Sequence, residues 1–179
     1  MRVLIIAPNG SYRSAPFVQA AARLQAQVMI ASEGPLATSD TNCPGLSLPL
    51  DHPAAALEKI IRAAAATPFT AILGTDDSTT ELAALAAAQL GLVHNPVGAV
   101  RLARRKDLAR ARLASAGVRV PAHRVLRLDQ PLAPQAADLA WPVVLKPVSL
   151  SASRGVMRAD NPAQLHDAVI RLQRILKTS

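Results

Sequence analysis

Short apolar runs alternate with segments of helical spacing over the first hundred residues. The run at residues 3–7 is almost continuous, which is typical of a strand covered on both faces. Strands that alternate with helices indicate an α/β fold with a Rossmann-like, doubly wound parallel sheet. A loop rich in Gly, Pro, Ser and Thr interrupts the pattern at residues 32–50. The predicted strands and helices begin, in order, at residues 3, 14, 28, 53, 70 and 79.

Two turns in this part of the chain are functional candidates, because ligands of such sheets bind at the carboxyl ends of the strands. One turn covers residues 9–13 and the other covers residues 74–78. Neither has the glycine spacing of a dinucleotide fingerprint, and the chain contains no P-loop motif. An acidic residue in the second turn could instead cap the helix that follows. The candidate substrate-binding residues are Ser11, Tyr12, Arg13, Asp76 and Asp77.

Charge divides the chain into two parts of opposite sign. Residues 1–100 contain five Lys and Arg against seven Asp and Glu, whereas residues 101–179 contain fifteen against five. This asymmetry predicts two domains, residues 1–100 and 101–179, with different roles. No apolar run approaches the roughly 20 residues of a membrane-spanning helix, and Cys43 is the only cysteine. We therefore expect a cytoplasmic protein with no membrane partner and no internal disulfide.

The basic part, residues 101–179, predicts a small α+β unit. A helix is expected from residue 96 or 100 to Ala116, where Gly117 ends it. The pattern then predicts a strand, a short helix, a strand–loop–strand unit and a last helix. These four segments cover, in order, residues 123–128, 135–139, 141–159 and 162–176.

The strand–loop–strand segment is suited to binding phosphate. A β-rich apolar run leads into Lys146, and Pro147 then begins a loop of small and hydroxyl residues. Such a loop brings backbone N–H groups and hydroxyls close to a phosphate chain, with lysine and arginine as counter-charges. The alternative is a hairpin in which Lys146 lies on a solvated face. The candidate residues of this segment are Lys146, Ser149, Ser151, Ser153, Arg154 and Gly155.

Lys106 is a second candidate, on the helix that ends at Ala116. On a helical wheel, Leu102, Ala109 and Leu113 fall in one stripe with Ala116, which we expect to be buried. Lys106 lies at the edge of this stripe, whereas most arginines of the helix need no explanation beyond solvation. A lysine at such an edge can also extend to water, so both interpretations of Lys106 stay open.

Taken in order, these features resemble the front half of the ATP-grasp superfamily, the group of biotin carboxylase, carbamoyl-phosphate synthase and the carboxylate–amine ligases. Residues 1–100 similarly resemble the pre-ATP-grasp domain, and the resemblance covers essentially the whole chain. It is carried by Lys106 ahead of Ala116-Gly117-Val118-Arg119-Val120-Pro121, by Pro142-Val143-Val144-Leu145-Lys146-Pro147, and by a flap that ends in Arg154-Gly155-Val156.

The resemblance implies that the cofactor is ATP and that Lys106 and Lys146 contact its phosphates, with Lys146 near the α-phosphate. It also implies a ligase in which a carboxylate and ATP form an acyl phosphate that an amine or a thiol captures. The residues implied to form the flap over the triphosphate are Ser149, Ser151, Ser153, Arg154 and Gly155.

The chain departs from the family pattern at the flap and at its end. Leu150 and Ala152 stand where family members usually carry glycine, and they adopt positive φ less freely. Only the first of the family's two ATP-enclosing subdomains is matched, and no glutamate follows Glu81 to hold Mg²⁺. We therefore expect a truncated or split ligase, inactive alone, with Mg²⁺ supplied by residues outside this chain. A complementing polypeptide or a homo-oligomer would complete the site, and we assign no catalytic or metal-binding residue within the chain.

Two other functions are alternatives. The chain could keep the scaffold without catalysis, as an interaction or nucleotide-sensing protein. The basic part could instead bind nucleic acid through its phosphates. Trp141 is the only aromatic residue of that part, so a stacking platform for bases is absent and nucleic acid is the less favoured partner.

Overall fold

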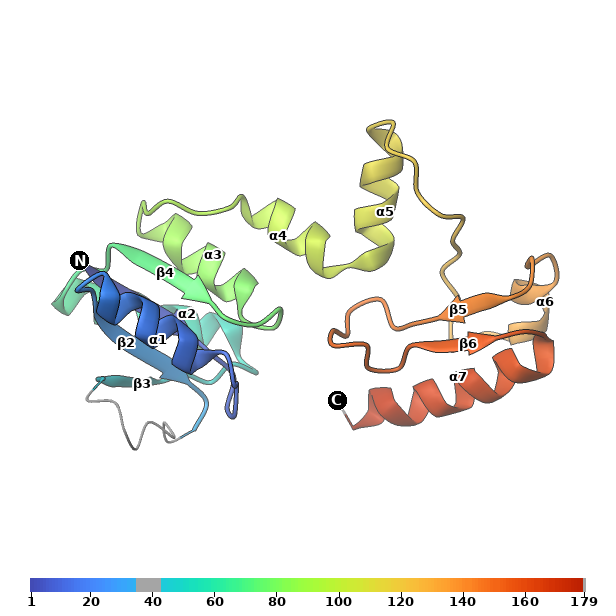
Figure 1. The fold of residues 1–179 in the computed structure, drawn as a ribbon, viewed down its shortest axis with the longest axis horizontal. Helices are drawn as coiled ribbons and strands as arrows, with labels where there is room; N and C mark the ends of the chain where they lie inside the picture. Colours follow the sequence, from blue (N-terminus) through green and yellow to red (C-terminus); the bar gives the residue numbers. More distant parts are fainter. Residues whose placement is uncertain (35–42, 179) are drawn as a thin grey trace. The chain divides into compact units, whose positions relative to one another are not determined.

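The structure, a computed structural model, describes residues 1–34 and 43–178. The chain divides into two compact units, Met1–Arg101 and Leu102–Ser179 (Figure 1). Within the described residues, no helix is both long enough and apolar enough to cross a membrane.

The first unit is built on a four-stranded parallel sheet (Figure 1). Its central strand β1 (Arg2–Ile6) lies between β2 (Gln27–Ser32) and β4 (Ala71–Gly74), and β3 (Gly45–Ser47) pairs with the outer edge of β2. Every pairing is parallel, and Leu4 of β1 lies opposite Met29 of β2 and Ile72 of β4. The prediction of an α/β fold with a parallel sheet is confirmed.

Helices cover both faces of this sheet because successive side chains of a strand point to opposite faces. Leu4 and Ile6 are buried against α2 (Pro53–Ala66) and α3 (Thr80–Gln89). Val3 and Ile5 are buried on the other face, which α1 (Ser14–Arg23) covers. Full burial of one Leu or Ile side chain contributes about 1.5–3 kcal/mol, so β1 holds both helix layers together.

The prediction of one continuous helix to Ala116 is wrong. The structure divides it at Arg105 into α4 (Val97–Arg104) and α5 (Lys106–Ser115), and Arg105 has extended backbone angles of φ −105° and ψ 104°. The Lys106 N–H donates to the Val148 carbonyl at 3.1 Å rather than to a carbonyl of its own helix. This contact, with a residue far along the chain, replaces one step of the helical ladder and ends α4.

The buried apolar stripe predicted on that helix is also wrong. Neither α4 nor α5 buries a side chain completely, and Leu108 and Leu113 are 43% and 46% exposed. Of the predicted stripe, Leu113 and Ala116 are exposed, and Leu102 and Ala109 are only half-buried.

The strand predicted at residues 123–128 does not form, because residues 118–127 have no regular secondary structure. The Arg127 N–H donates to Gln135 Oε1 at 2.8 Å, and Gln135 Nε2 donates to the Arg127 carbonyl at 3.0 Å. The side-chain amide of Gln135 thus satisfies the backbone groups that a neighbouring strand would otherwise pair with. Gln135 lies in α6 (Leu132–Ala136), which begins earlier than the predicted short helix.

A hairpin and a long helix form the rest of the second unit (Figure 1). β5 (Val143–Leu145) pairs with β6 (Met157–Ala159) in antiparallel register, and α7 (Pro162–Lys177) buries Leu165 and Leu172. The helix begins where the Asn161 side chain accepts the Gln164 N–H at 3.0 Å, a side-chain N-cap. The predicted strand–flap–strand unit and the last helix are therefore present.

Candidate functional site

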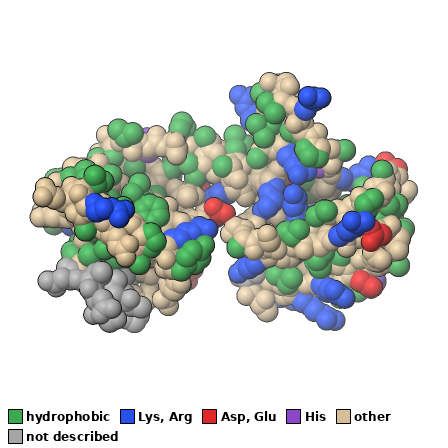
Figure 2. Space-filling view, viewed as in Figure 1, with side chains coloured by type: hydrophobic (Ala, Val, Ile, Leu, Met, Phe, Trp, Pro, Cys, Tyr) green, Lys and Arg blue, Asp and Glu red, His purple; other side chains and the backbone are tan. Residues whose placement is uncertain are grey.

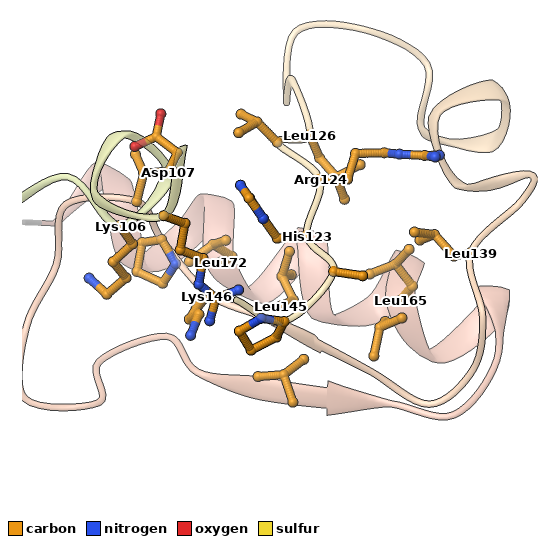
Figure 3. Close-up of a pocket in the computed structure, with 18 of the residues that line it drawn as sticks. Lys106, Asp107, His123, Arg124, Leu126, Leu139, Leu145, Lys146, Leu165 and Leu172 are labelled. Carbon is orange, nitrogen blue, oxygen red and sulfur yellow. The ribbon is translucent and has the colours of Figure 1, made fainter. Parts of the chain in front are cut away.

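The second unit contains a cavity of about 860 Å³ (Figure 3). It lies among the first turn of α5, the irregular segment before α6, β5 with the residues that follow it, and α7. Leucines from these elements form much of its lining, which suits the apolar part of a ligand. The labelled leucines of Figure 3 are Leu126, Leu139, Leu145, Leu165 and Leu172.

Within the described part of the chain, four Lys and Arg side chains line the same cavity. One of them, Arg124, is paired with Asp138, and the other three are Lys106, Arg110 and Lys146. Lys106 begins α5 and Arg110 follows one turn later on the same face of the helix. Lys146 comes directly after β5, and Figure 3 shows it at the same end of the cavity as Lys106, away from Leu139. All three residues are partly exposed, so their side chains can reach a ligand.

The carboxylates that line the cavity are already paired with arginine. Asp107 accepts two hydrogen bonds from Arg105, at 3.0 and 2.7 Å, and these bonds hold the pKa of Asp107 below its ordinary value. The hydrogen bonds from Arg124 lower the pKa of Asp138 to about 2. Because arginine already neutralises the carboxylates of Asp107 and Asp138, these carboxylates do not cancel the positive charge of Lys106. The cavity therefore attracts anions.

Positive charge exceeds negative charge over the whole second unit. Figure 2 shows many Lys and Arg side chains and few Asp and Glu side chains on the visible face of this unit. Among the described residues, no group of three His, Cys, Asp or Glu side chains could hold a metal ion. The cavity thus has the charge of an anion site and lacks the oxygen ligands that Mg²⁺ requires.

The loop between β5 and β6, here called the flap, contains two consecutive tight turns. The Arg154 N–H donates to the Ser151 carbonyl at 3.1 Å, and the two central residues, Ala152 and Ser153, have φ of 52° and 58°. Positive φ at both central positions is the geometry of a type I′ turn, which usually contains Asn and Gly. Alanine and serine therefore adopt the left-handed conformation here, although the sequence predicts that they do so less freely than glycine.

Gly155 is required by the second turn of the flap. Its φ is 71°, and a Cβ at this position would lie 2.8 Å from Leu172 Cδ1. The Val156 N–H donates to the Ser153 carbonyl at 3.2 Å and closes this turn. Any larger residue at position 155 would strain the backbone and push against α7.

The structure brings together only some of the residues predicted to bind phosphate. Lys106, Lys146 and Ser149 line the cavity, whereas the flap tip does not. Ser151 and Ser153 are exposed there. The remaining predicted flap residues, Arg154 and Gly155, also lie outside the cavity lining.

Most of the residues that line the cavity were not singled out from the sequence, and the charged or titratable ones among them are Asp107, Arg110, His123, Arg124 and Asp138. Arg110 could have been found, because it stands four residues after Lys106 and therefore on the same helical face. His123 had no such signal, since it lies in the segment that was expected to be a strand. Figure 3 shows its ring between Lys106 and Leu126.

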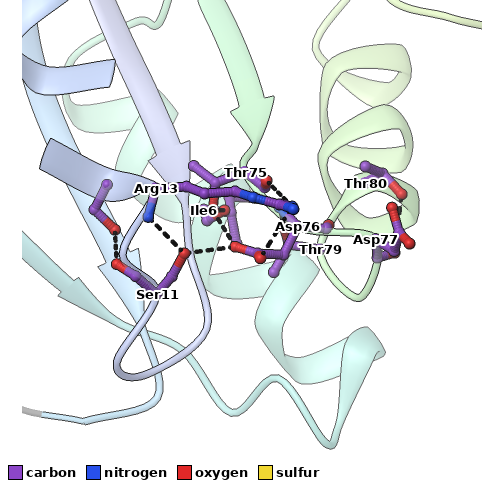
Figure 4. A network of polar contacts seen from close by, with 9 residues as sticks. Ile6, Ser11, Arg13, Thr75, Asp76, Asp77, Thr79 and Thr80 are labelled. Atoms are coloured by element: carbon purple, nitrogen blue, oxygen red, sulfur yellow. Dashed lines mark hydrogen bonds and ion pairs between the residues drawn. The ribbon is translucent and has the colours of Figure 1, made fainter. Parts of the chain in front are cut away.

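A separate polar cluster lies at the carboxyl ends of β1 and β4 in the first unit (Figure 4). Asp76 Oδ2 accepts hydrogen bonds from Ser11 Oγ and Thr75 Oγ1, each at 2.7 Å, and Asp76 Oδ1 lies 3.3 Å from Arg13 NH1. The Asp76 side chain is therefore bonded to both turns and does not cap α3, whose N-cap Thr79 has no side-chain cap bond.

The other two residues predicted for this cluster, Tyr12 and Asp77, lie at its margin. Tyr12 is 80% exposed, with the Arg13 guanidinium 5.4 Å from its ring centre. Figure 4 shows Asp77 beside Thr80, away from Ser11. The strands β1 and β4 flank the point where the chain reverses its direction across the sheet, which is where ligands of doubly wound sheets bind.

Comparison with known proteins gives structural matches only. An L-amino acid ligase from Bacillus licheniformis matches with a TM-score of 0.74 and 26% identity, over 96% of this chain and 42% of the ligase. An ADP complex of N5-carboxyaminoimidazole ribonucleotide synthetase matches with a TM-score of 0.73 and 14% identity, over 96% of this chain and 44% of the synthetase. A carboxyaminoimidazole ribonucleotide synthase from Aspergillus clavatus, complexed with ATP, matches with a TM-score of 0.68 and 18% identity, over 94% and 44%.

The chain thus spans less than half the length of these enzymes. No protein-family model matches it, and no curated protein matches it. The matched part is the same throughout: a parallel-sheet unit followed by a smaller unit with a hairpin and helices. These matches confirm the fold that the resemblance predicted.

Proposed function

We propose that this chain, which has the fold of the N-terminal part of ATP-grasp ligases, binds the phosphates of ATP in the cavity of its second unit. The observation that carries the proposal is the convergence of Lys106, Arg110 and Lys146 on one cavity whose carboxylates are already paired. Two of the matching structures are complexes with ADP or ATP, which supports the same ligand.

The shape and the charge of the cavity suit the two ends of a nucleotide. A polyphosphate carries several negative charges, and lysine and arginine bind phosphate oxygens through charge-assisted hydrogen bonds. Leu139 and Leu165, which Figure 3 shows away from Lys106 and Lys146, offer an apolar surface to a base. Ser149 follows Lys146 by three residues, also lines the cavity and can donate its hydroxyl to a phosphate oxygen.

The full reaction that we propose is an ATP-dependent ligation of a carboxylate to an amine or a thiol through an acyl phosphate. One matching structure is an L-amino acid ligase, which is the support for this class of reaction. The cluster of Ser11, Arg13 and Asp76 is the proposed substrate-binding region of the first unit, with Tyr12 and Asp77 at its margin.

Residues outside this chain complete the proposed ligase. The described residues offer no set of carboxylates for Mg²⁺, so other residues hold the metal and enclose the nucleotide. They belong to a longer chain, to a complementing polypeptide or to a second copy. We propose that the 179-residue chain alone does not turn over ATP.

Titration with ATP tests the binding step. We expect Lys146→Met to weaken ATP binding by about 10–100-fold, because a hydrogen bond to a charged group contributes about 1.5–3 kcal/mol and 1.4 kcal/mol corresponds to tenfold. Lys177→Met is the matched control, since Lys177 ends α7 and does not line the cavity. Equal affinity of the two variants would remove Lys146 from the site.

The two alternative functions give different results in the same experiments. A nucleotide-sensing protein binds ATP at this cavity and shows no turnover even when the residues that would complete a ligase site are supplied. A nucleic-acid-binding protein binds a long polyanion with an affinity that falls steeply with salt. It also binds that polyanion more tightly than ATP.

A further inference from the structure

We infer that Lys106 binds two alternative partners, the backbone of the flap when the cavity is empty and an anion when it is filled, so that anion binding releases the flap. The inference rests on the proposed phosphate site and adds a control of that site. Its basis is a pair of hydrogen bonds between one residue and the first part of the flap.

Lys106 holds the flap through both its backbone and its side chain. Its N–H donates to the Val148 carbonyl at 3.1 Å, and its Nζ donates to the Leu150 carbonyl. In an extended chain the carbonyls of residues two apart point the same way, so one residue can contact both. Lys106 therefore joins the start of α5 to the flap, in addition to lining the cavity.

An anion in the cavity competes with the Leu150 carbonyl for this ammonium group. A carbonyl oxygen is neutral, whereas a phosphate oxygen is charged, and hydrogen bonds between two charged groups are roughly twice as strong. The ammonium group of Lys106 has three donors. A ligand that also contacts Arg110 and Lys146 is held in one place, so the side chain of Lys106 must turn towards that place to bind it. We therefore expect the ligand to draw Lys106 Nζ away from the flap.

The flap itself favours release. Ala152 and Ser153 have φ of 52° and 58°, which are strained for residues with a Cβ, and their turn is closed by the single Arg154 N–H bond to Ser151. Such a turn persists only when neighbouring contacts hold it. The bond from Lys106 Nζ to Leu150, immediately before this turn, is one such contact.

Lys146 provides the matched comparison for Lys106. Both lysines line the cavity and both are partly exposed, so removing either takes one positive charge from the site. Among the described residues, the side chain of Lys146, which is itself the first residue of the flap, makes no hydrogen bond to a flap carbonyl, whereas the side chain of Lys106 donates to the Leu150 carbonyl. A change in the flap that follows Lys106→Met and not Lys146→Met therefore reports the bond rather than the charge.

The first measurement is amide hydrogen exchange in the full chain without ligand. In Lys106→Met we expect the amides of Arg154 and Val156, which close the two flap turns, to exchange at least tenfold faster than in the wild type. In Lys146→Met we expect them to stay within twofold. Equal exchange in the two variants, whether fast or slow, would overturn the inference.

The second measurement uses inorganic tripolyphosphate, which has no base. The amide of Ser151 shares its peptide group with the Leu150 carbonyl, so its NMR shift reports the bond to Lys106. We expect tripolyphosphate to move this resonance in the wild type in the direction that Lys106→Met moves it without ligand. Binding heat without any movement of Ser151 would contradict the inference.

The two proposals fail in different ways. Absence of tripolyphosphate and ATP binding to the wild type would reject the phosphate site, and the exchange comparison without ligand would still decide whether Lys106 holds the flap. If tripolyphosphate binds to the wild type but the flap amides of Lys106→Met exchange as in the wild type, the hold of Lys106 on the flap is rejected and the phosphate site stands.

Discussion

At the scale of single residues, Ala152 occupies a conformation that glycine adopts at lower cost. Its φ of 52° lies in the left-handed region, where a residue with a Cβ loses about 1–2 kcal/mol. We expect Ala152→Gly to stabilise the second unit by up to about 1 kcal/mol, because the entropy that glycine adds to the unfolded chain offsets part of the relief. Denaturant unfolding measures the difference.

The control for this prediction is an alanine-to-glycine substitution at a position with ordinary helical backbone angles. Ala114 is exposed within α5, where alanine to glycine costs about 1 kcal/mol. Opposite signs at the two positions are expected. A loss of stability in both variants would show that Ala152 is not strained.

Asp138 gives a prediction about pH. The hydrogen bonds from Arg124 lower its pKa from 3.8 to about 2, so its carboxylate is bound more tightly in the folded state than in the unfolded state. The contribution to stability is therefore complete above pH 4 and is lost as the pH falls towards 2. Carboxyl NMR should find the Asp138 midpoint near 2 in the wild type and near its ordinary value in Arg124→Met. An unchanged midpoint in the variant would assign the shift to another cause.

The residues of the candidate site show what local sequence can and cannot reveal. The place of Lys146 at a cavity was predictable, because a lysine inside an apolar β-rich run must reach a cleft or water. Arg110 was recoverable from its spacing to Lys106. The separation of Ser151 and Ser153 from the cavity was not predictable, because it depends on turn geometry that the residue types disfavour.

At the scale of elements, the first unit was predictable and the second was less so. The strands of the first unit are apolar runs buried on both faces, so composition alone marks them. The break at Arg105 and the missing strand at residues 123–128 arise from contacts with Val148 and Gln135, which no local pattern contains. Tertiary hydrogen bonds overrode the helical and strand signals in both places.

Gln135 gives the prediction at this scale. Its side-chain amide both accepts from the Arg127 N–H and donates to the Arg127 carbonyl. We expect Gln135→Ala to destabilise the second unit by about 1 kcal/mol and to speed exchange of the Arg127 amide, since both backbone groups lose a partner. Gln135→Glu keeps the acceptor and loses the donor, so the Arg127 amide should stay protected in that variant. If the Arg127 amide exchanges as fast in Gln135→Glu as in Gln135→Ala, the side chain of Gln135 does not hold this segment.

At the scale of the whole molecule, the two units differ in the sign of their charge. Residues 101–179 carry fifteen Lys and Arg against five Asp and Glu, and the carboxylates at the cavity are paired with arginine. A polyphosphate supplies the negative charge that this unit lacks. The same imbalance predicts how a metal ion affects binding, because Mg²⁺ brings two positive charges to the phosphates.

Mg²⁺ should weaken ATP binding to the 179-residue chain by several-fold. The ion reduces the attraction of the phosphates to Lys106, Arg110 and Lys146, and no set of carboxylates among the described residues repays this loss by binding the ion. Calorimetry at constant ionic strength, with ATP in EDTA and then in Mg²⁺, measures the ratio of the two dissociation constants. The ligase that we propose needs Mg²⁺, so the opposite order is expected once residues outside this chain complete the site. Tighter binding with Mg²⁺ to this chain alone would mean that it contains metal ligands, and would reject the assignment of the metal to residues outside it.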